Sequence, residues 1–133
     1  MLQPFLTLYT QLPQWIRWLA ASALLGCTTW LLVLPGSVFP KEDWLDKVYA
    51  DKWIHIFLMG ALSLLWMLAI ADSGTAGLTR KLLIIAIFVT CYGLGMEFVQ
   101  KYLVVNRSFD MGDVVADAAG AFLPLVIMRL QRK

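Results

Sequence analysis

Four long apolar runs constrain this chain more than any other feature of its sequence. They cover about residues 15–34, 52–71, 81–103 and 111–128. A helix of about 20 apolar residues crosses the roughly 30 Å of hydrocarbon in a bilayer. The runs therefore predict an all-α membrane protein of four transmembrane helices, with residues 1–133 forming a single membrane domain.

The composition is that of a membrane protein rather than a soluble one. Hydrophobic residues make up 60% of the chain and charged residues 15%, whereas soluble domains are about 45–50% apolar and about 25% charged. Pro35 and Gly36 end the first run, and short connections follow the others, which favours an up-down-up-down bundle. The net charge of +2 gives no basic surface for nucleic acid, so nucleic acid is excluded as a partner.

Small residues predict where two of the helices pack. Gly93 and Gly95 on the third helix, with Ala116 and Gly120 on the fourth, favour a close third–fourth contact. Outside the four runs, residues 1–14 are expected to form a short entry segment at the interface, and residues 41–51 a surface amphipathic helix.

The unusual polar residues fall at one end of the predicted bundle. If the helices alternate in direction, the end of the first, the start of the second, the end of the third and the start of the fourth share one membrane face. Ionisable residues are costly to leave facing lipid, and they mark a functional site by default. The candidate ligand-binding residues are Asp51, Lys52, His55, Glu97, Gln100, Arg107, Asp110, Asp113 and Asp117. We expect Asp51, His55, Glu97, Arg107 and Asp113 to share one pocket.

The positive charges predict an orientation. The positive-inside rule counts Lys and Arg near the membrane. The cluster face holds Lys41, Lys47, Lys52, Lys101 and Arg107, and the opposite face holds Arg17, Arg80, Lys81, Arg129, Arg132 and Lys133. Because Lys52 and Arg107 are expected to be neutralised within the cluster, both termini are predicted to be cytoplasmic.

Three motifs follow one another along the chain: D-K-x-x-H at Asp51–His55, E-x-x-Q at Glu97–Gln100 and R-S-F-D-x-x-D-x-x-x-D-x-x-G at Arg107–Gly120. Together, in this order, they resemble the VanZ-like family of small bacterial membrane proteins. The resemblance covers about residues 45–128. Asp117 stands where the family often has Asn. The resemblance implies a protein of the bacterial cytoplasmic membrane with a cell-envelope role that affects glycopeptide-antibiotic tolerance.

Three functions fit the polar cluster. In the first, the cluster binds a membrane lipid or a lipid-linked envelope precursor, with Arg107 and Lys52 meeting a phosphate at headgroup level. In the second, an enzyme acts on a lipid phosphate or sugar, with His55, Glu97 or Asp113 as acid or base. In the third, the cluster is purely structural: its ion pairs hold the helix ends together, and Asp110 or Asp113 caps the fourth helix.

Other classes of function are less well supported by the sequence. A transport pathway requires polar residues along its whole length, and the cluster lies at one end. A divalent metal held by His55, Glu97, Asp113 and Asp117 is set aside, because hard cations prefer several oxygens and the spacings match no metal motif. No cofactor is predicted, and the sequence allows oligomerisation without specifying it.

Overall fold

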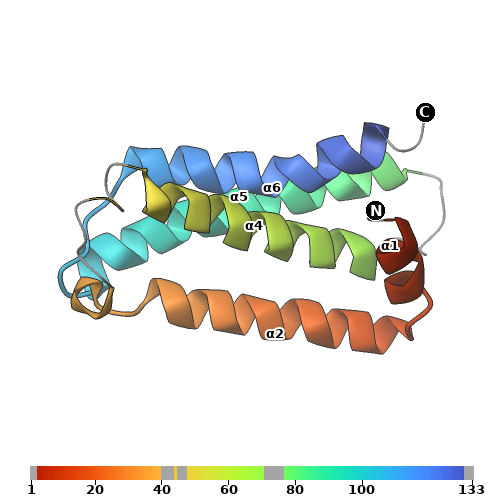
Figure 1. Cartoon of the computed structure of the whole chain (residues 1–133), viewed down its shortest axis with the longest axis horizontal. Helices are drawn as coiled ribbons and strands as arrows, with labels where there is room; N and C mark the ends of the chain where they lie inside the picture. The colour runs from red at the N-terminus through yellow and green to blue at the C-terminus, as the bar shows by residue number, and fades with distance from the viewer. Residues whose placement is uncertain (1–2, 40–43, 45–47, 71–76, 131–133) are drawn as a thin grey trace.

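Helices make up all the regular structure that the computed structural model describes, which comprises residues 3–39, 44, 48–70 and 77–130. Figure 1 shows the long helices side by side, with α1 near one end of them. The elements are α1 (Gln3–Thr10), α2 (Gln14–Leu32), the 3-10 turn η1 (Gly36–Val38), α4 (Ala50–Ala69), α5 (Leu78–Leu103) and α6 (Met111–Leu130). The predicted all-α class is confirmed.

Four of these helices are long and apolar enough to cross a membrane. The helices α2, α4, α5 and α6 contain 19, 20, 26 and 20 residues. At a rise of 1.5 Å per residue they are about 28–39 Å long, which matches the roughly 30 Å hydrocarbon layer. By length and composition, the chain is a multi-pass membrane protein.

The outer surface of the helices is apolar, while several polar side chains lie inside. Phe57, Phe88 and Leu103 are 74%, 71% and 78% exposed. His55 and Glu97, by contrast, are 4% and 1% exposed. Large apolar side chains that face outward suit a lipid environment, whereas in water such a surface would favour aggregation.

The polar end of the bundle is where α2 and α5 end and where α4 and α6 begin (Figure 1). Its connections touch, since the backbone N–H of Gly36 donates to the carbonyl of Val105 at 3.2 Å. At the opposite end, Nη1 of Arg17 in α2 donates to the carbonyl of Leu68 in α4 at 2.9 Å. Hydrogen bonds between separate segments of the chain therefore hold both ends of the bundle.

Glycines set the closest approach between α4 and α6. A Cβ at Gly120 would collide with the backbone of Ile56, and a Cβ at Gly60 would lie 3.4 Å from the Gly120 carbonyl oxygen. Ser63 also donates to the carbonyl of Ala121 at 2.7 Å. The prediction that Gly120 serves a third–fourth contact is wrong, because Gly120 faces α4, the second long helix.

The other predicted contact residues divide between the interior and the surface. A Cβ at Gly93 in α5 would lie 2.5 Å from Oδ2 of Asp117 in α6, so Gly93 does mediate contact between these helices. Gly95 has nothing within 4 Å of its would-be Cβ and is exposed. Ala116 is buried in α6.

The segments outside the long helices differ from their predictions in part. The predicted entry segment, residues 1–14, contains the helix α1, in which Tyr9 donates to the carbonyl of Arg17 at 3.4 Å. Most of the predicted surface helix at 41–51 lies outside the described residues. The third long helix begins at Leu78 rather than at 81, because Gly77 takes a left-handed conformation (φ 72°) directly before it.

We expect Gly120→Ala to destabilise the protein, because its methyl group must displace the backbone of Ile56. Overpacking of this kind costs about 1–3 kcal/mol. Thermal unfolding in detergent, followed by circular dichroism, measures the effect. Gly95→Ala is the matched control, since an exposed helical Gly→Ala change stabilises by about 0.5–1 kcal/mol. Equal melting temperatures for the two variants would contradict this packing.

Candidate functional site

Lys52 is the centre of the first group of charges at the polar end. Its ammonium lies 2.8 Å from Asp110 Oδ2, 2.8 Å from Asp113 Oδ1 and 3.1 Å from Asp51 Oδ2. The Lys52 side chain is 25% exposed, and that of Asp113 is 10% exposed. Three carboxylates thus surround one ammonium, and Lys52 joins the first turn of α4 to the first turn of α6.

Asp110 combines this ion pair with a helix cap. Its Oδ1 accepts the backbone N–H of Gly112 at 2.7 Å, in the first turn of α6. The predicted capping by Asp110 is therefore confirmed. The hydrogen bond from Lys52, followed by the one from Gly112, holds the pKa of the Asp110 carboxyl below its ordinary value of 3.8. Asp110 is thus ionised in the folded protein at neutral pH.

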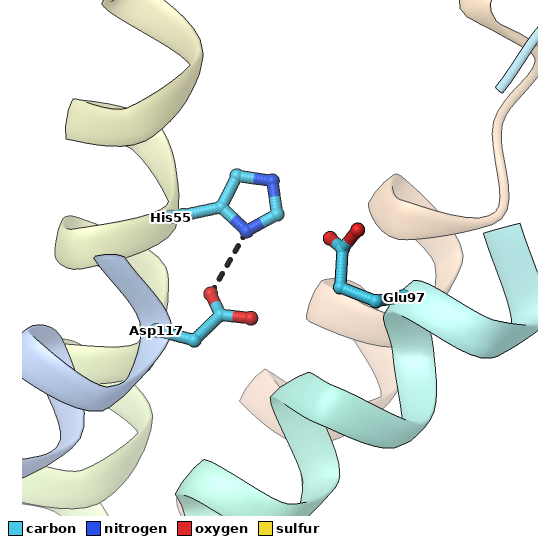
Figure 2. Close-up of side chains that lie close together, drawn as sticks. All are labelled: His55, Glu97 and Asp117. Carbon is cyan, nitrogen blue, oxygen red and sulfur yellow. Dashed lines mark hydrogen bonds and ion pairs between the residues drawn. The ribbon is translucent and has the colours of Figure 1, made fainter. Parts of the chain in front are cut away.

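His55, Glu97 and Asp117 form a second, deeper group. Figure 2 shows the three side chains reaching toward one another from α4, α5 and α6. Nδ1 of His55 and Oδ1 of Asp117 are hydrogen bonded at 2.8 Å. All three residues are at least 96% buried, with exposed fractions of 4%, 1% and 1%. The ligand atoms of the three residues all lie within 4.8 Å of one another.

Two carboxylate oxygens of this second group have no hydrogen-bond partner. They are Oε1 of Glu97 and Oδ2 of Asp117, and both are buried. The absence of a side chain at Gly93 leaves the space that the Asp117 carboxylate occupies. A buried polar atom without a partner costs about 1–3 kcal/mol, more when it is charged. The site therefore holds hydrogen-bonding capacity that the fold does not use.

The two groups adjoin each other at the start of α6. The backbone N–H of Asp110 donates to Oε2 of Glu97 at 3.0 Å. Oδ2 of Asp113 lies 3.8 Å from Nε2 of His55, while its Oδ1 contacts Lys52. Seven of the nine candidate residues are thereby connected, namely Asp51, Lys52, His55, Glu97, Asp110, Asp113 and Asp117.

Gln100 and Arg107 make their contacts elsewhere. Nε2 of the buried Gln100 donates to the carbonyl of Leu32 at 3.0 Å, which satisfies the last turn of α2. The Arg107 guanidinium lies over the Phe39 ring, 4.7 Å from its centroid. Within the ranges that the structure describes, Arg107 forms no ion pair. No described contact joins Arg107 to His55 or the carboxylates, so the expectation that they share one pocket stays a prediction.

One buried cation was assigned only to the surface by the sequence. Arg17 counts among the basic residues of the predicted cytoplasmic face, yet it is 2% exposed and bonds to the end of α4. The sequence did indicate this burial, because Arg17 lies inside an apolar run, where a charged residue faces the bundle interior by default. The pairing with Leu68 could not be read from sequence, because a carbonyl partner leaves no mark in the residue pattern.

Two apolar grooves lie outside the polar groups. One, of about 400 Å³, runs between α4 and α6 and begins at Trp53, next to Lys52. The other, of about 610 Å³, is bounded by α2, α4 and α5. Neither groove is lined by α4, α5 and α6 together, and neither contains His55 or Glu97.

Comparison with known proteins finds a similar protein in a yeast. An uncharacterized protein of the fission yeast Schizosaccharomyces pombe is 35% identical over 85 residues, which are 62% of this chain. The chain covers 49% of the length of that relative. No family model matches the chain, and no solved structure matches it. The chain is thus similar to a eukaryotic protein, and the match carries no statement about activity.

The lowered pKa of Asp110 predicts a loss of stability in acid. A depressed folded-state pKa contributes stability that is present above the unfolded pKa and is lost as the pH falls through the folded value, below 3.8. Melting temperatures measured from about pH 6 to about pH 2.5 test this. Asp110→Asn should flatten the profile, because Asn still caps α6 but no longer ionises, whereas Asp51→Asn should leave the contribution of Asp110 in place. An unchanged profile in Asp110→Asn would refute the assignment.

Proposed function

We propose that the protein binds the headgroup of a membrane lipid or lipid-linked envelope precursor at its polar end. The observation that carries this proposal is the setting of Arg107. Its guanidinium is half-buried over Phe39, and no carboxylate of the described residues pairs with it. Arg matches phosphate geometry with two parallel hydrogen bonds, and this end of the bundle lies at the level of lipid headgroups.

The charge distribution separates Arg107 from the other cation of the site. Lys52 is within 3.1 Å of three carboxylates, so little of its charge is left for a ligand. Nε of Arg107 is buried and has no hydrogen-bond partner. Among the described residues at this end, Arg107 is therefore better suited than Lys52 to bind a phosphate.

The carboxylates favour a headgroup that also carries hydroxyl groups. Asp51 and Asp110 have side chains that are 55% and 47% exposed, and they can accept hydrogen bonds from a sugar or a glycerol. The groove between α4 and α6 begins at Trp53, beside Lys52, and is apolar along its length. It suits an acyl or prenyl chain whose headgroup lies at the polar end.

The wider setting is part of the same proposal. In it the four helices cross the membrane up-down-up-down and both termini are cytoplasmic. The VanZ-like resemblance implies a bacterial cytoplasmic membrane and a role in the envelope and in glycopeptide tolerance. Support for this setting comes from the Lys and Arg distribution and from the three motifs. The yeast relative adds support for neither a bacterial source nor antibiotic tolerance.

The contact between His55 and Asp117 favours a second candidate, an enzyme acting on a lipid phosphate or sugar. A carboxylate 2.8 Å from Nδ1 fixes the orientation of the imidazole, as in acid–base catalysis. Glu97 and Asp113 are the further candidate acids or bases. The third reading, a purely structural cluster, explains Gln100 and Asp110, whose polar atoms satisfy helix ends.

Native mass spectrometry of the protein, extracted from its own membrane with mild detergent, tests the headgroup site. We expect a co-purifying phospholipid or prenyl-phosphate mass that is lost in Arg107→Ala, because the phosphate loses its guanidinium partner. Lys101→Ala is the matched control, since Lys101 is an exposed cation at the same end whose ammonium lies over Tyr102. If the same lipid remains bound to Arg107→Ala and to wild type, Arg107 does not hold the headgroup.

A turnover assay separates the enzyme from the binder. Vesicles containing phosphatidic acid and a prenyl phosphate are incubated with the protein, and released phosphate is measured. In an enzyme, His55→Gln should lower the rate by about 10²–10⁴-fold while the lipid mass is still retained, because an acid–base group is lost but the guanidinium remains. Equal phosphate release by wild type and His55→Gln would exclude His55 as the acid or base of that reaction.

A further inference from the structure

We propose that His55, Glu97 and Asp117 bind one divalent transition-metal ion between α4, α5 and α6. Each helix supplies one ligand, so the ion would link three separate segments of the chain. The proposal is independent of the headgroup site, because it requires no lipid and does not involve Arg107. It assigns a role to side chains whose polar atoms the fold leaves partly unused.

The geometry allows one ion to reach all three side chains. Figure 2 shows the imidazole and both carboxylates around a common space. Their ligand atoms lie within 4.8 Å of one another. Ligand atoms in a tetrahedral shell with bonds of about 2.1 Å are about 3.4 Å apart, so each ligand atom would move inward by less than about 1 Å, and water would occupy the open position.

The unpartnered oxygens point to a cationic ligand. Oε1 of Glu97 and Oδ2 of Asp117 are buried acceptors without a donor. No Lys or Arg of the described residues forms an ion pair with either carboxylate, and their one cationic neighbour is the imidazole of His55 when it is protonated. Two ionised carboxylates removed from water are stable together only with compensating charge. A divalent ion supplies that charge and uses both free oxygens.

The first group of carboxylates provides an internal comparison. Asp51, Asp110 and Asp113 also have ligand atoms within 4.8 Å of one another. The Lys52 ammonium already lies between them, at 2.8–3.1 Å from each. Lys52 thus balances the charge of the first group, the outer carboxylates Asp51, Asp110 and Asp113. Among the described residues, the inner carboxylates Glu97 and Asp117 have no cation of equal strength. A metal ion is accordingly assigned to the inner group alone.

The ligand types select the class of metal. One imidazole nitrogen with two carboxylate oxygens suits Zn²⁺, Mn²⁺ or Fe²⁺. Ca²⁺ takes six to eight oxygen ligands, and Mg²⁺ avoids dedicated all-protein sites, so both fit this donor set less well. We therefore expect Zn²⁺ and Mn²⁺ to bind more tightly than Mg²⁺.

Neighbouring groups already orient the ligands. Oε2 of Glu97 accepts the backbone N–H of Asp110 at 3.0 Å, which leaves Oε1 for the ion. The missing side chain at Gly93 lets the Asp117 carboxylate enter between α5 and α6. Such outer contacts fix ligand orientation in metal sites. The competing interpretation is a protonated His55 that forms an ion pair with Asp117 and binds no metal.

The binding test uses protein purified in detergent with an affinity tag that lacks histidine, then stripped of metal by a chelator. Titration calorimetry with Zn²⁺, Mn²⁺ and Mg²⁺ gives affinities, and elemental analysis gives stoichiometry. We expect one Zn²⁺ or Mn²⁺ per chain. Changing an outer-shell partner weakens a metal by about 10–100-fold, so loss of a ligand in Glu97→Gln or Asp117→Asn should cost at least about 100-fold. The control Asp51→Asn should bind as wild type does.

A second measurement needs no variant and is therefore unaffected by misfolding. His55 is the one histidine of the chain. Pulsed electron paramagnetic resonance of bound Mn²⁺ should show coupling to an imidazole ¹⁴N nucleus, which in this protein arises from His55. Absence of stoichiometric Zn²⁺ or Mn²⁺ binding by wild type, or Mn²⁺ without imidazole coupling, would overturn the proposal in favour of the ion pair. Unweakened binding by a folded Glu97→Gln variant would overturn it as well.

Discussion

The burial of charge inside an apolar bundle is the constraint on which the rest of this structure depends. Lys52 satisfies it at the polar end by approaching Asp110 and Asp113 at 2.8 Å each. Charges taken out of water repay their desolvation only at close range and with their hydrogen bonds satisfied. This contact fixes how far α4 is displaced along α6. About one turn further along both helices, the same alignment brings His55 to Asp117.

Small residues make this alignment sterically possible. Gly120 lets the α6 backbone approach Ile56, and Ser63 then reaches the carbonyl of Ala121. Gly93 allows a similarly close approach between α5 and α6. The space it leaves is occupied by the Asp117 carboxylate rather than by backbone. The polar site therefore depends on close helix packing, because a longer distance between the helices would move His55, Glu97 and Asp117 apart. Small residues at interhelical contacts favour such approach in membranes.

The sequence predicted the long helices and the residues of the polar end, because both are local properties. Run length and apolar content define a membrane helix, and the position of a charge in a run defines its depth. The partners of those charges were less predictable. Arg107 stacks on Phe39, and Gly120 faces α4, because spacing gives the face of a helix but not its rotation against its neighbours. Carbonyl partners, such as Leu32 for Gln100, leave no sequence signal at all.

Stabilisation of the fold accounts for part of the polar end. Lys52, Asp110 and Gln100 use their polar atoms on ion pairs and helix ends. Oε1 of Glu97, Oδ2 of Asp117 and Nε of Arg107 are buried without partners, although these are among the most costly atoms to bury unpaired. Apolar side chains of similar size would stabilise the bundle at least as well as these groups do. Stability alone therefore does not account for their presence. A buried unsatisfied polar group needs an explanation. The free oxygens of the inner carboxylates fit a cation, and the free guanidinium nitrogen fits an anion, so the two kinds of ligand are assigned to different residues of the same end.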